Sequence, residues 1–200
     1  MPRYALLLML LFAGAAPRLR AQTEYHARLG AVGATDLLHD AIVSELTVRQ
    51  SIAPMLAVGG SLPIGPKGYR ANLEATFSSG GFHRNEAGSK IDIGTLRTGT
   101  LLLGLEGPLW QHFRWRAGLG AIRYFPTEKQ GIFLAGGTTR FLAGGGIDYR
   151  YPVLPNWDLM TSARYDLHRF RTGTLEARGF SQSQGVSRVS LSIGLSRGIR

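Results

Sequence analysis

The chain contains no cysteine, which excludes a disulfide framework and a lipid anchor of the lipoprotein kind. Acidic residues are also scarce, because 13 Asp and Glu stand against 23 Lys and Arg and leave a formal net charge of +10. A charge of this sign suits nucleic acid or an anionic membrane surface as a partner. The basic residues are spread along the chain and no nucleic-acid motif accompanies them, so we expect no nucleic-acid partner.

Beyond the N-terminus, no run approaches the roughly 20 apolar residues that a membrane helix requires. The N-terminus itself has the pattern of a secretory signal, with Arg3 before an apolar stretch that ends at Ala16. That stretch is too short to span a bilayer as a helix. We expect cleavage after Ala21, or near Ala16, so that residues 1–21 are a signal peptide and residues 22–200 form one mature domain.

The mature sequence alternates between apolar residues and small or polar ones. In the final stretch, Val189, Leu191 and Ile193 are separated by Ser190 and Ser192. A period of two residues predicts β-strands with two different faces, and the 27 glycines fit tightly curved strands. Eight segments follow this pattern: residues 24–33, 48–62, 69–77, 91–107, 113–125, 140–151, 157–170 and the final strand from residue 185 onward.

The links between these segments alternate in length. Short links are rich in Pro, Gly and Asn, as turns are, and long links are more polar. This alternation predicts an all-β fold, an eight-stranded antiparallel up-and-down barrel with periplasmic turns and extracellular loops. A propeller would need four short strands in each repeat, whereas each unit here holds two long ones. The short links are residues 63–68, 107–111 and 152–156, and the long links are residues 34–47, 78–90, 126–139 and 172–184.

Two local features modify this pattern. Pro54 lies inside the second segment and has no N–H to donate to a ladder, so it predicts a bulge or a break there. In the first long link, the apolar residues of Asp36–Glu45 share one helical face and predict a short helix.

The two faces of the strands distinguish a membrane barrel from a soluble one. A lipocalin-like barrel hides its apolar face, whereas a membrane barrel turns that face to lipid. Here the apolar face carries aromatic residues at the short-turn ends, which suits the membrane–water interface. The opposite face combines small residues with Arg and carboxylates, which can pair in a narrow lumen. We therefore expect a transmembrane barrel whose aromatic girdle is Tyr69, Trp110, Phe113, Trp115, Tyr149, Tyr151 and Trp157.

With its signal sequence, strand count, alternating links and girdle, the mature chain resembles the eight-stranded outer-membrane barrels of the OmpA-like kind. The segment Arg150–Asp158 is similar to the periplasmic turns of such barrels. The resemblance implies insertion in the outer membrane of a diderm bacterium. We expect a monomer in contact with outer-membrane lipids and lipopolysaccharide and inserted by the outer-membrane assembly machinery. The chain departs from these barrels at its end, where Arg200 replaces the usual terminal aromatic residue and Ile199 is the candidate substitute.

The charged residues of the polar face are the candidate functional site. One hypothesis is a plug of salt bridges, since the interior of eight strands is too narrow for a free channel. The other is a binding site for a small anion, since Arg outnumbers the carboxylates. The predicted lumen set is Glu24, His26, Arg28, Arg49, Arg70, Glu74, Glu106, Arg114, Arg116, Arg140, Asp148, Arg150, Asp158, Arg164, Asp166, His168 and Arg188.

An enzyme that modifies lipid A would need a serine activated by a histidine, with a carboxylate to orient it. His26, His112 and His168 are available, and Asp166 shares a strand face with His168. However, no serine stands in an evident signature with any of these histidines. No His, Asp and Glu cluster has metal-ligand spacing either. We therefore expect no enzyme, no catalytic residues, no cofactor and no metal.

The long links carry basic residues that are either solvated loop charges or contacts to anionic lipid headgroups. The predicted function is that of an integral outer-membrane protein with a structural or passive surface role, a charge-plugged lumen and four extracellular loops. The alternatives are transport or binding of a small amphiphile or anion through the barrel mouth and, third, a lipid-modifying enzyme. The loop cations are Arg84, Lys90, Arg123, Lys129, Arg171 and Arg178.

Overall fold

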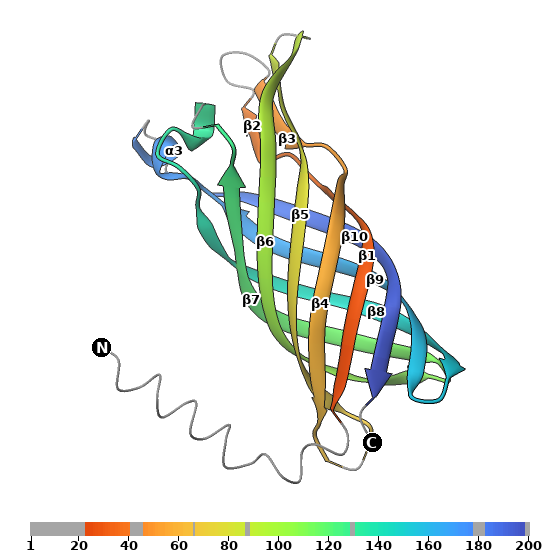
Figure 1. Cartoon of the computed structure of the whole chain (residues 1–200). Helices are drawn as coiled ribbons and strands as arrows, with labels where there is room; N and C mark the ends of the chain where they lie inside the picture. The colour runs from red at the N-terminus through yellow and green to blue at the C-terminus, as the bar shows by residue number, and fades with distance from the viewer. Residues whose placement is uncertain are drawn as a thin grey trace.

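The computed structural model describes residues 23–40, 46–65, 67–86, 89–128, 131–177 and 183–198. These residues form a barrel of long, tilted strands (Figure 1). The predicted signal peptide and Ile199 lie outside the described residues. In the described ranges, no helix is long and apolar enough to cross a membrane.

Within these ranges, ten strands form one antiparallel sheet, and eight of them close into the barrel. The barrel closes where β1 pairs with β10, from Glu24 opposite Gly198 to Ala34 opposite Arg188. The other barrel strands pair with their neighbours in the chain, so the predicted eight-stranded up-and-down barrel is confirmed. The elements are β1 (Glu24–Ala34), β2 (Leu38–Asp40), β3 (Leu46–Gln50), β4 (Ala53–Pro63), β5 (Arg70–Glu86), β6 (Ser89–Trp110), β7 (Phe113–Pro126), η2 (Gly131–Phe133), β8 (Thr139–Leu154), β9 (Trp157–Phe170), α3 (Gly173–Ala177) and β10 (Gln184–Gly198).

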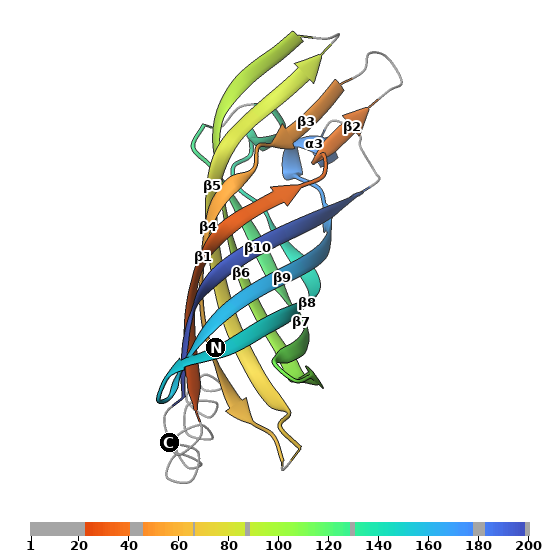
Figure 2. The ribbon, with the colours of Figure 1, turned by 90° about the vertical axis from the view of Figure 1, so that its right-hand side faces the viewer.

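The barrel has two different ends. At the turn end, short links join β4 to β5, β6 to β7 and β8 to β9, and β1 begins and β10 ends there. In one of these turns, Asn156 has a φ of 65°, a left-handed conformation that Asn tolerates well. At the loop end, β5 and β6 continue past the barrel as a hairpin, β3 pairs with the β5 edge of this hairpin, and β2 pairs with β3 (Figure 2). In bacterial outer-membrane barrels the short turns are periplasmic and the longer loops are extracellular.

The predicted second segment, residues 48–62, forms two strands instead of one. The ladder is interrupted at residues 51–52, just before Pro54, where the proline predicted a bulge or break. The interruption reverses the alternation, because Val48 is buried while Ile52 is 77% exposed. Residues on β3 therefore face the opposite way from the sequence-based assignment.

The long links contain more regular structure than the sequence predicted. The helix predicted in the first link is not found in its described part, where Leu38–Asp40 forms the strand β2, and residues 41–45 lie outside the described ranges. The helical turns lie elsewhere, in η2 and α3. Thr172 Oγ1 donates a hydrogen bond of 2.6 Å to the Ile132 carbonyl, and the Ala135 N–H donates one of 3.0 Å to Thr174 Oγ1. These bonds hold two of the loops together.

The two faces of the wall differ in polarity, as the alternation predicted. On β9, Tyr165 and Leu167 are exposed on the outside, whereas Arg164 and Asp166 are buried inside. In a closed barrel the backbone N–H and C=O groups of every strand are paired with neighbouring strands, so the barrel can be surrounded by hydrocarbon. An apolar outside with a polar inside is the arrangement of a transmembrane barrel and the inverse of a soluble one.

Glycine permits the close approach of β1 and β10 where the barrel closes. A Cβ on Gly194 would lie 2.0 Å from the Ala27 carbonyl oxygen, and one on Gly30 would lie 2.0 Å from that of Leu191. Backbone atoms cannot move aside as a flexible side chain could. The tight curvature at this seam therefore requires a residue without a side chain.

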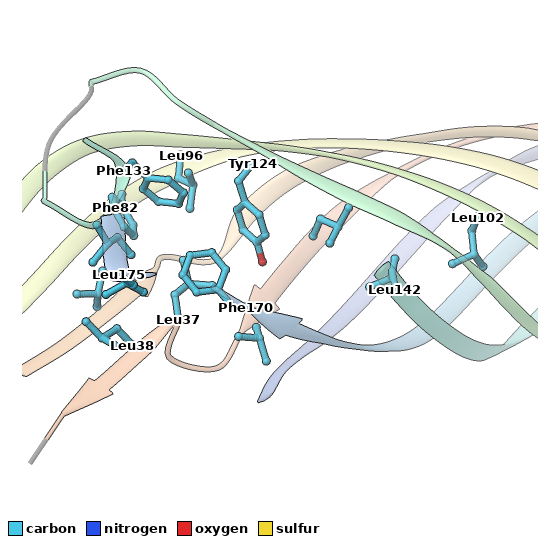
Figure 3. Close-up of a cluster of buried hydrophobic side chains, with 14 residues drawn as sticks. Leu37, Leu38, Phe82, Leu96, Leu102, Tyr124, Phe133, Leu142, Phe170 and Leu175 are labelled. Atoms are coloured by element: carbon cyan, nitrogen blue, oxygen red, sulfur yellow. The ribbon is translucent and has the colours of Figure 1, made fainter. Parts of the chain in front are cut away.

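The interior of the loop-end half is filled by an apolar cluster (Figure 3). Its aromatic rings pack edge to face or tilted, with centroids 5.6 Å apart for Phe82 and Phe133 and 5.1 Å apart for Tyr124 and Phe170. The cluster runs from loop residues to side chains of the barrel wall. Its members are Leu37, Leu38, Val48, Phe82, Leu96, Leu102, Ile122, Tyr124, Ile132, Phe133, Leu142, Phe170, Leu175 and Val186.

Candidate functional site

The turn-end half of the interior holds buried charges, and Glu74 of β5 lies at their centre. Its carboxylate contacts side chains from three other strands. Arg116 Nη1 lies 2.5 Å from Oε2, and Arg164 Nη1 lies 2.7 Å from Oε1. Arg28 also donates to Oε2, and His26 Nε2 lies 3.1 Å from the same oxygen. One carboxylate therefore joins β1, β5, β7 and β9 across the lumen.

Two further carboxylates complete this central group. Asp148 Oδ2 accepts hydrogen bonds of 2.9 and 2.5 Å from Nε and Nη2 of Arg116. Asp166 forms a bidentate pair with Arg164, at 2.6 and 2.7 Å. Arg28 lies 3.6 Å from Asp148. Charge-assisted bidentate pairs are the strong kind of ion pair, and here three arginines and three carboxylates balance one another.

A second charged group lies nearer the turn end, around Glu106 of β6. The Glu106 side chain is fully buried, and the nearest nitrogens of Arg150, Arg70 and Arg114 lie 3.3, 3.6 and 3.7 Å from its carboxylate. Glu24 pairs with Arg150 and lies 3.8 Å from Arg70 Nε. This group lies between the central group and the turn end of the barrel.

Arg188 of β10 is buried without such compensation. Its residue exposure is 3%, and its cross-strand neighbour Asp166 is engaged by Arg164. Arg188 Nη2 lies 3.0 Å from Thr98 Oγ1 and 3.3 Å from Ser78 Oγ. Its Nη1 has no hydrogen-bond partner, and no carboxylate of the described residues lies within ion-pair distance of Arg188.

Besides Arg188 and His168, three members of the predicted lumen set lie away from the two charged groups. Arg49 was assigned to the lumen, but its side chain is 56% exposed on the outside of β3 and its Nε lies 3.1 Å from Asp36. The reversed alternation at residues 51–52 explains this difference. Arg140 lies among the loops, where Nε donates a 2.8 Å hydrogen bond to the Arg171 carbonyl. Asp158 is half-buried in the barrel opening at the turn end.

Each candidate catalytic histidine has a structural contact. His26 pairs with Glu74, and His168 Nε2 lies 2.5 Å from the Tyr124 hydroxyl. His112 lies in the turn after β6 and packs against Tyr149, with ring centroids 5.9 Å apart. Tyr124 was not among the predicted lumen residues, although its position two residues after the inward Ile122 could have indicated it.

The aromatic residues of the predicted girdle gather at the turn end and contact one another. Ring centroids lie 6.4 Å apart for Tyr69 and Trp115. Phe113 lies between Trp110, at 6.1 Å, and Tyr149, at 5.1 Å. The remaining members are placed by other contacts: Tyr151 lies 6.1 Å from the His112 ring, and Trp157 lies beneath the Arg197 guanidinium at 5.3 Å. Such a belt fits the headgroup level of a bilayer.

No family model matches this chain, and no curated protein matches it in sequence. Solved structures with a similar fold include Neisserial surface protein A, with a TM-score of 0.61 at 13% identity over 88% of this chain and 96% of that one. The outer membrane protein OprG from Pseudomonas aeruginosa follows at 0.52 and 11%, covering 90% and 96%. Ail, the attachment invasion locus protein of Yersinia pestis, in complex with the heparin analogue sucrose octasulfate, gives 0.51 and 12%, covering 88% and 99%.

These similarities define a class of protein. The chain has the fold of small outer-membrane β-barrel proteins, and its apolar wall and polar interior require a lipid bilayer around it. The fold predicted from the sequence and the resemblance to these barrels are both confirmed. The outer membrane is the bilayer in which barrels of this fold stand.

Proposed function

We propose that this protein is a structural or surface protein of the outer membrane whose barrel does not conduct. The observation that carries the proposal is the Glu74 group, in which side chains of four strands meet on one buried carboxylate. Eight strands enclose a space that side chains can fill. Moving a hydrated ion through it would require separating several buried charge pairs, which costs several kcal/mol for each ion left unpaired.

Two closures in series support the same proposal. The ion-paired groups occupy the turn-end half of the barrel, and the apolar cluster occupies the loop-end half. A solute that passed one of them would still meet the other. We expect a monomer that is inserted by the outer-membrane assembly machinery and presents its loops outside the cell.

Single-channel recording in planar bilayers tests this proposal. We expect near-zero conductance for the refolded wild-type protein. In the variant Glu74→Ala with Arg116→Ala, we expect brief openings, because the central group then loses one member of each sign. Arg49→Gln is the matched control, since Arg49 lies outside the lumen. Stable conductance steps in the wild-type protein would refute the proposal.

A second candidate function is binding of a small amphiphile at the barrel mouth. The observation that favours it is the aromatic character of the loop-end cluster, where Phe82, Phe133 and Phe170 line the interior next to the loops. Titration with an apolar fluorescent probe would detect such binding, and Phe133→Ala should change it. A lipid-modifying activity is tested separately by mass spectrometry of lipid A from a heterologous host, in which we expect no loss or gain of an acyl chain.

A further inference from the structure

Two arginines lie on the outer wall of the barrel, on neighbouring strands. Arg97 of β6 and Arg123 of β7 are both exposed and stand in the outward phase of their strands. In the register, Arg97 lies opposite Phe125 and Arg123 lies opposite Gly99. The two are therefore diagonal neighbours on one face of the sheet, a separation of about 7–8 Å that long side chains bridge easily.

Their height places them at the outer edge of the membrane. Gly107 lies opposite Trp115 of the girdle, and ten residues separate it from Arg97 along β6. At about 3.3 Å per residue this is about 33 Å of strand. A tilt of about 40° reduces it to about 25 Å of height, which is the height of the apolar band of such barrels. Arg123 starts slightly lower, and a side chain of its length can extend to the headgroup level.

The side chains around the pair bring the two cations to one place. The Arg123 guanidinium lies over the Phe125 ring, 5.2 Å from its centroid, so it extends toward the residue that faces Arg97. Gly99 has no side chain that could separate the two guanidinium groups, and a Cβ at this position would lie 3.4 Å from the Phe125 ring. Ser79 lies opposite Arg97 and Thr139 lies opposite Arg123, and both supply hydroxyl groups.

The charge of this pair is uncompensated within the described part of the chain. Neither arginine forms an ion pair there, in contrast to Arg49, which pairs with Asp36. Two guanidinium groups near each other at the edge of a hydrocarbon layer repel more strongly than they would in water. An anion held between them would remove this repulsion. Below them, Leu101 and Phe77 form part of the exposed apolar wall.

We propose that Arg97 and Arg123 form a binding site for the phosphate of a phosphorylated lipid in the outer leaflet, whose acyl chains lie along the wall below. The inference rests on the proposed outer-membrane insertion but not on a closed lumen. Guanidinium groups bind phosphate oxygens with paired hydrogen bonds. In a phosphorylated lipid, the phosphate would contact the two arginines and the acyl chains would contact the apolar wall below them.

The test is native mass spectrometry of the refolded, detergent-solubilised protein titrated with bisphosphorylated lipid A. We expect Arg97→Gln and Arg123→Gln each to weaken binding about fivefold, the effect of about one basic residue at an anionic lipid surface. Arg169→Gln is the matched control, because Arg169 is an exposed arginine on β9 that faces Gly185 of β10 rather than a second cation. We expect less than a twofold effect from it.

Several results would overturn the assignment. An equal loss in Arg169→Gln would show a general charge effect, and unchanged binding of fully dephosphorylated lipid A would show that phosphate is not recognised. Arg-dependent binding of a soluble sulfated oligosaccharide in place of lipid A would assign the pair to a soluble polyanion. Heat-modifiability of each variant on gels confirms that its barrel is folded. A conducting wild-type protein would refute the closed lumen and leave this site unaffected, so the two failures are distinguishable.

Discussion

Replacing Glu74 by Gln should be the most damaging conservative change in the barrel wall. The substitution keeps the shape of the side chain and removes its charge. Glu74 contacts Arg28, Arg116 and Arg164, and its side chain is 2% exposed. In the variant, three buried guanidinium groups share two carboxylates, Asp148 and Asp166.

The magnitude follows from how well each arginine is held by its remaining partner. Arg116 and Arg164 keep paired contacts of 2.5–2.9 Å with their aspartates, whereas Arg28 keeps only Asp148 at 3.6 Å. At an effective dielectric constant of about 20, one unit-charge pair about 4 Å apart attracts by about 4 kcal/mol. Removing one partner from a buried pair typically costs about 3–5 kcal/mol. We expect the free energy of unfolding to fall by that amount.

Urea-induced unfolding from lipid vesicles, followed by tryptophan fluorescence, measures this loss, because Trp110, Trp115 and Trp157 lie in the girdle. Asp36→Asn is the control, since the Asp36–Arg49 pair is largely exposed and should contribute at most about 1 kcal/mol. Combining Glu74→Gln with Arg28→Met should recover part of the loss by removing the least compensated cation. A Glu74→Gln variant as stable as the control would refute this account of the interior.

Three other changes test separate parts of the structure. Arg188→Met should raise the free energy of unfolding by about 1–3 kcal/mol in the same urea assay, because an apolar side chain replaces a buried charge without a carboxylate partner. Gly194→Ala should lower it by about 1–3 kcal/mol, since its Cβ would meet backbone 2.0 Å away, whereas Gly185→Ala, which meets nothing within 4 Å, should be neutral. Phe133→Ala should cost about 3–5 kcal/mol through the cavity it leaves and should speed limited proteolysis of the loops.

The alternation of residues predicted the barrel well because each wall position has only two environments. Leu102 shows where that signal ends, since it sits inside an unbroken run of leucines and faces the lumen. A period of two cannot be read from a run of one kind. Arg49 was placed wrongly because the interruption at residues 51–52 puts β3 out of phase with β4, whose alternation had been extended back to Val48. Phe133 comes from a loop, whose packing depends on contacts distant in sequence and not on periodicity.

The division of the interior into a charged half and an apolar half follows from what surrounds each half. Beside the membrane, an apolar side chain gains little by turning inward, because the lipid outside is equally apolar. Charged residues such as Glu74 and Arg116 therefore determine which face of a strand turns inward there, since on the outer face they would contact hydrocarbon. At the loop end the alternative environment is water, so burying Phe82 and Phe133 removes apolar surface from water and stabilises the loops. The same strands thus use ion pairs around Glu74 and Glu106, and hydrophobic packing toward the loops.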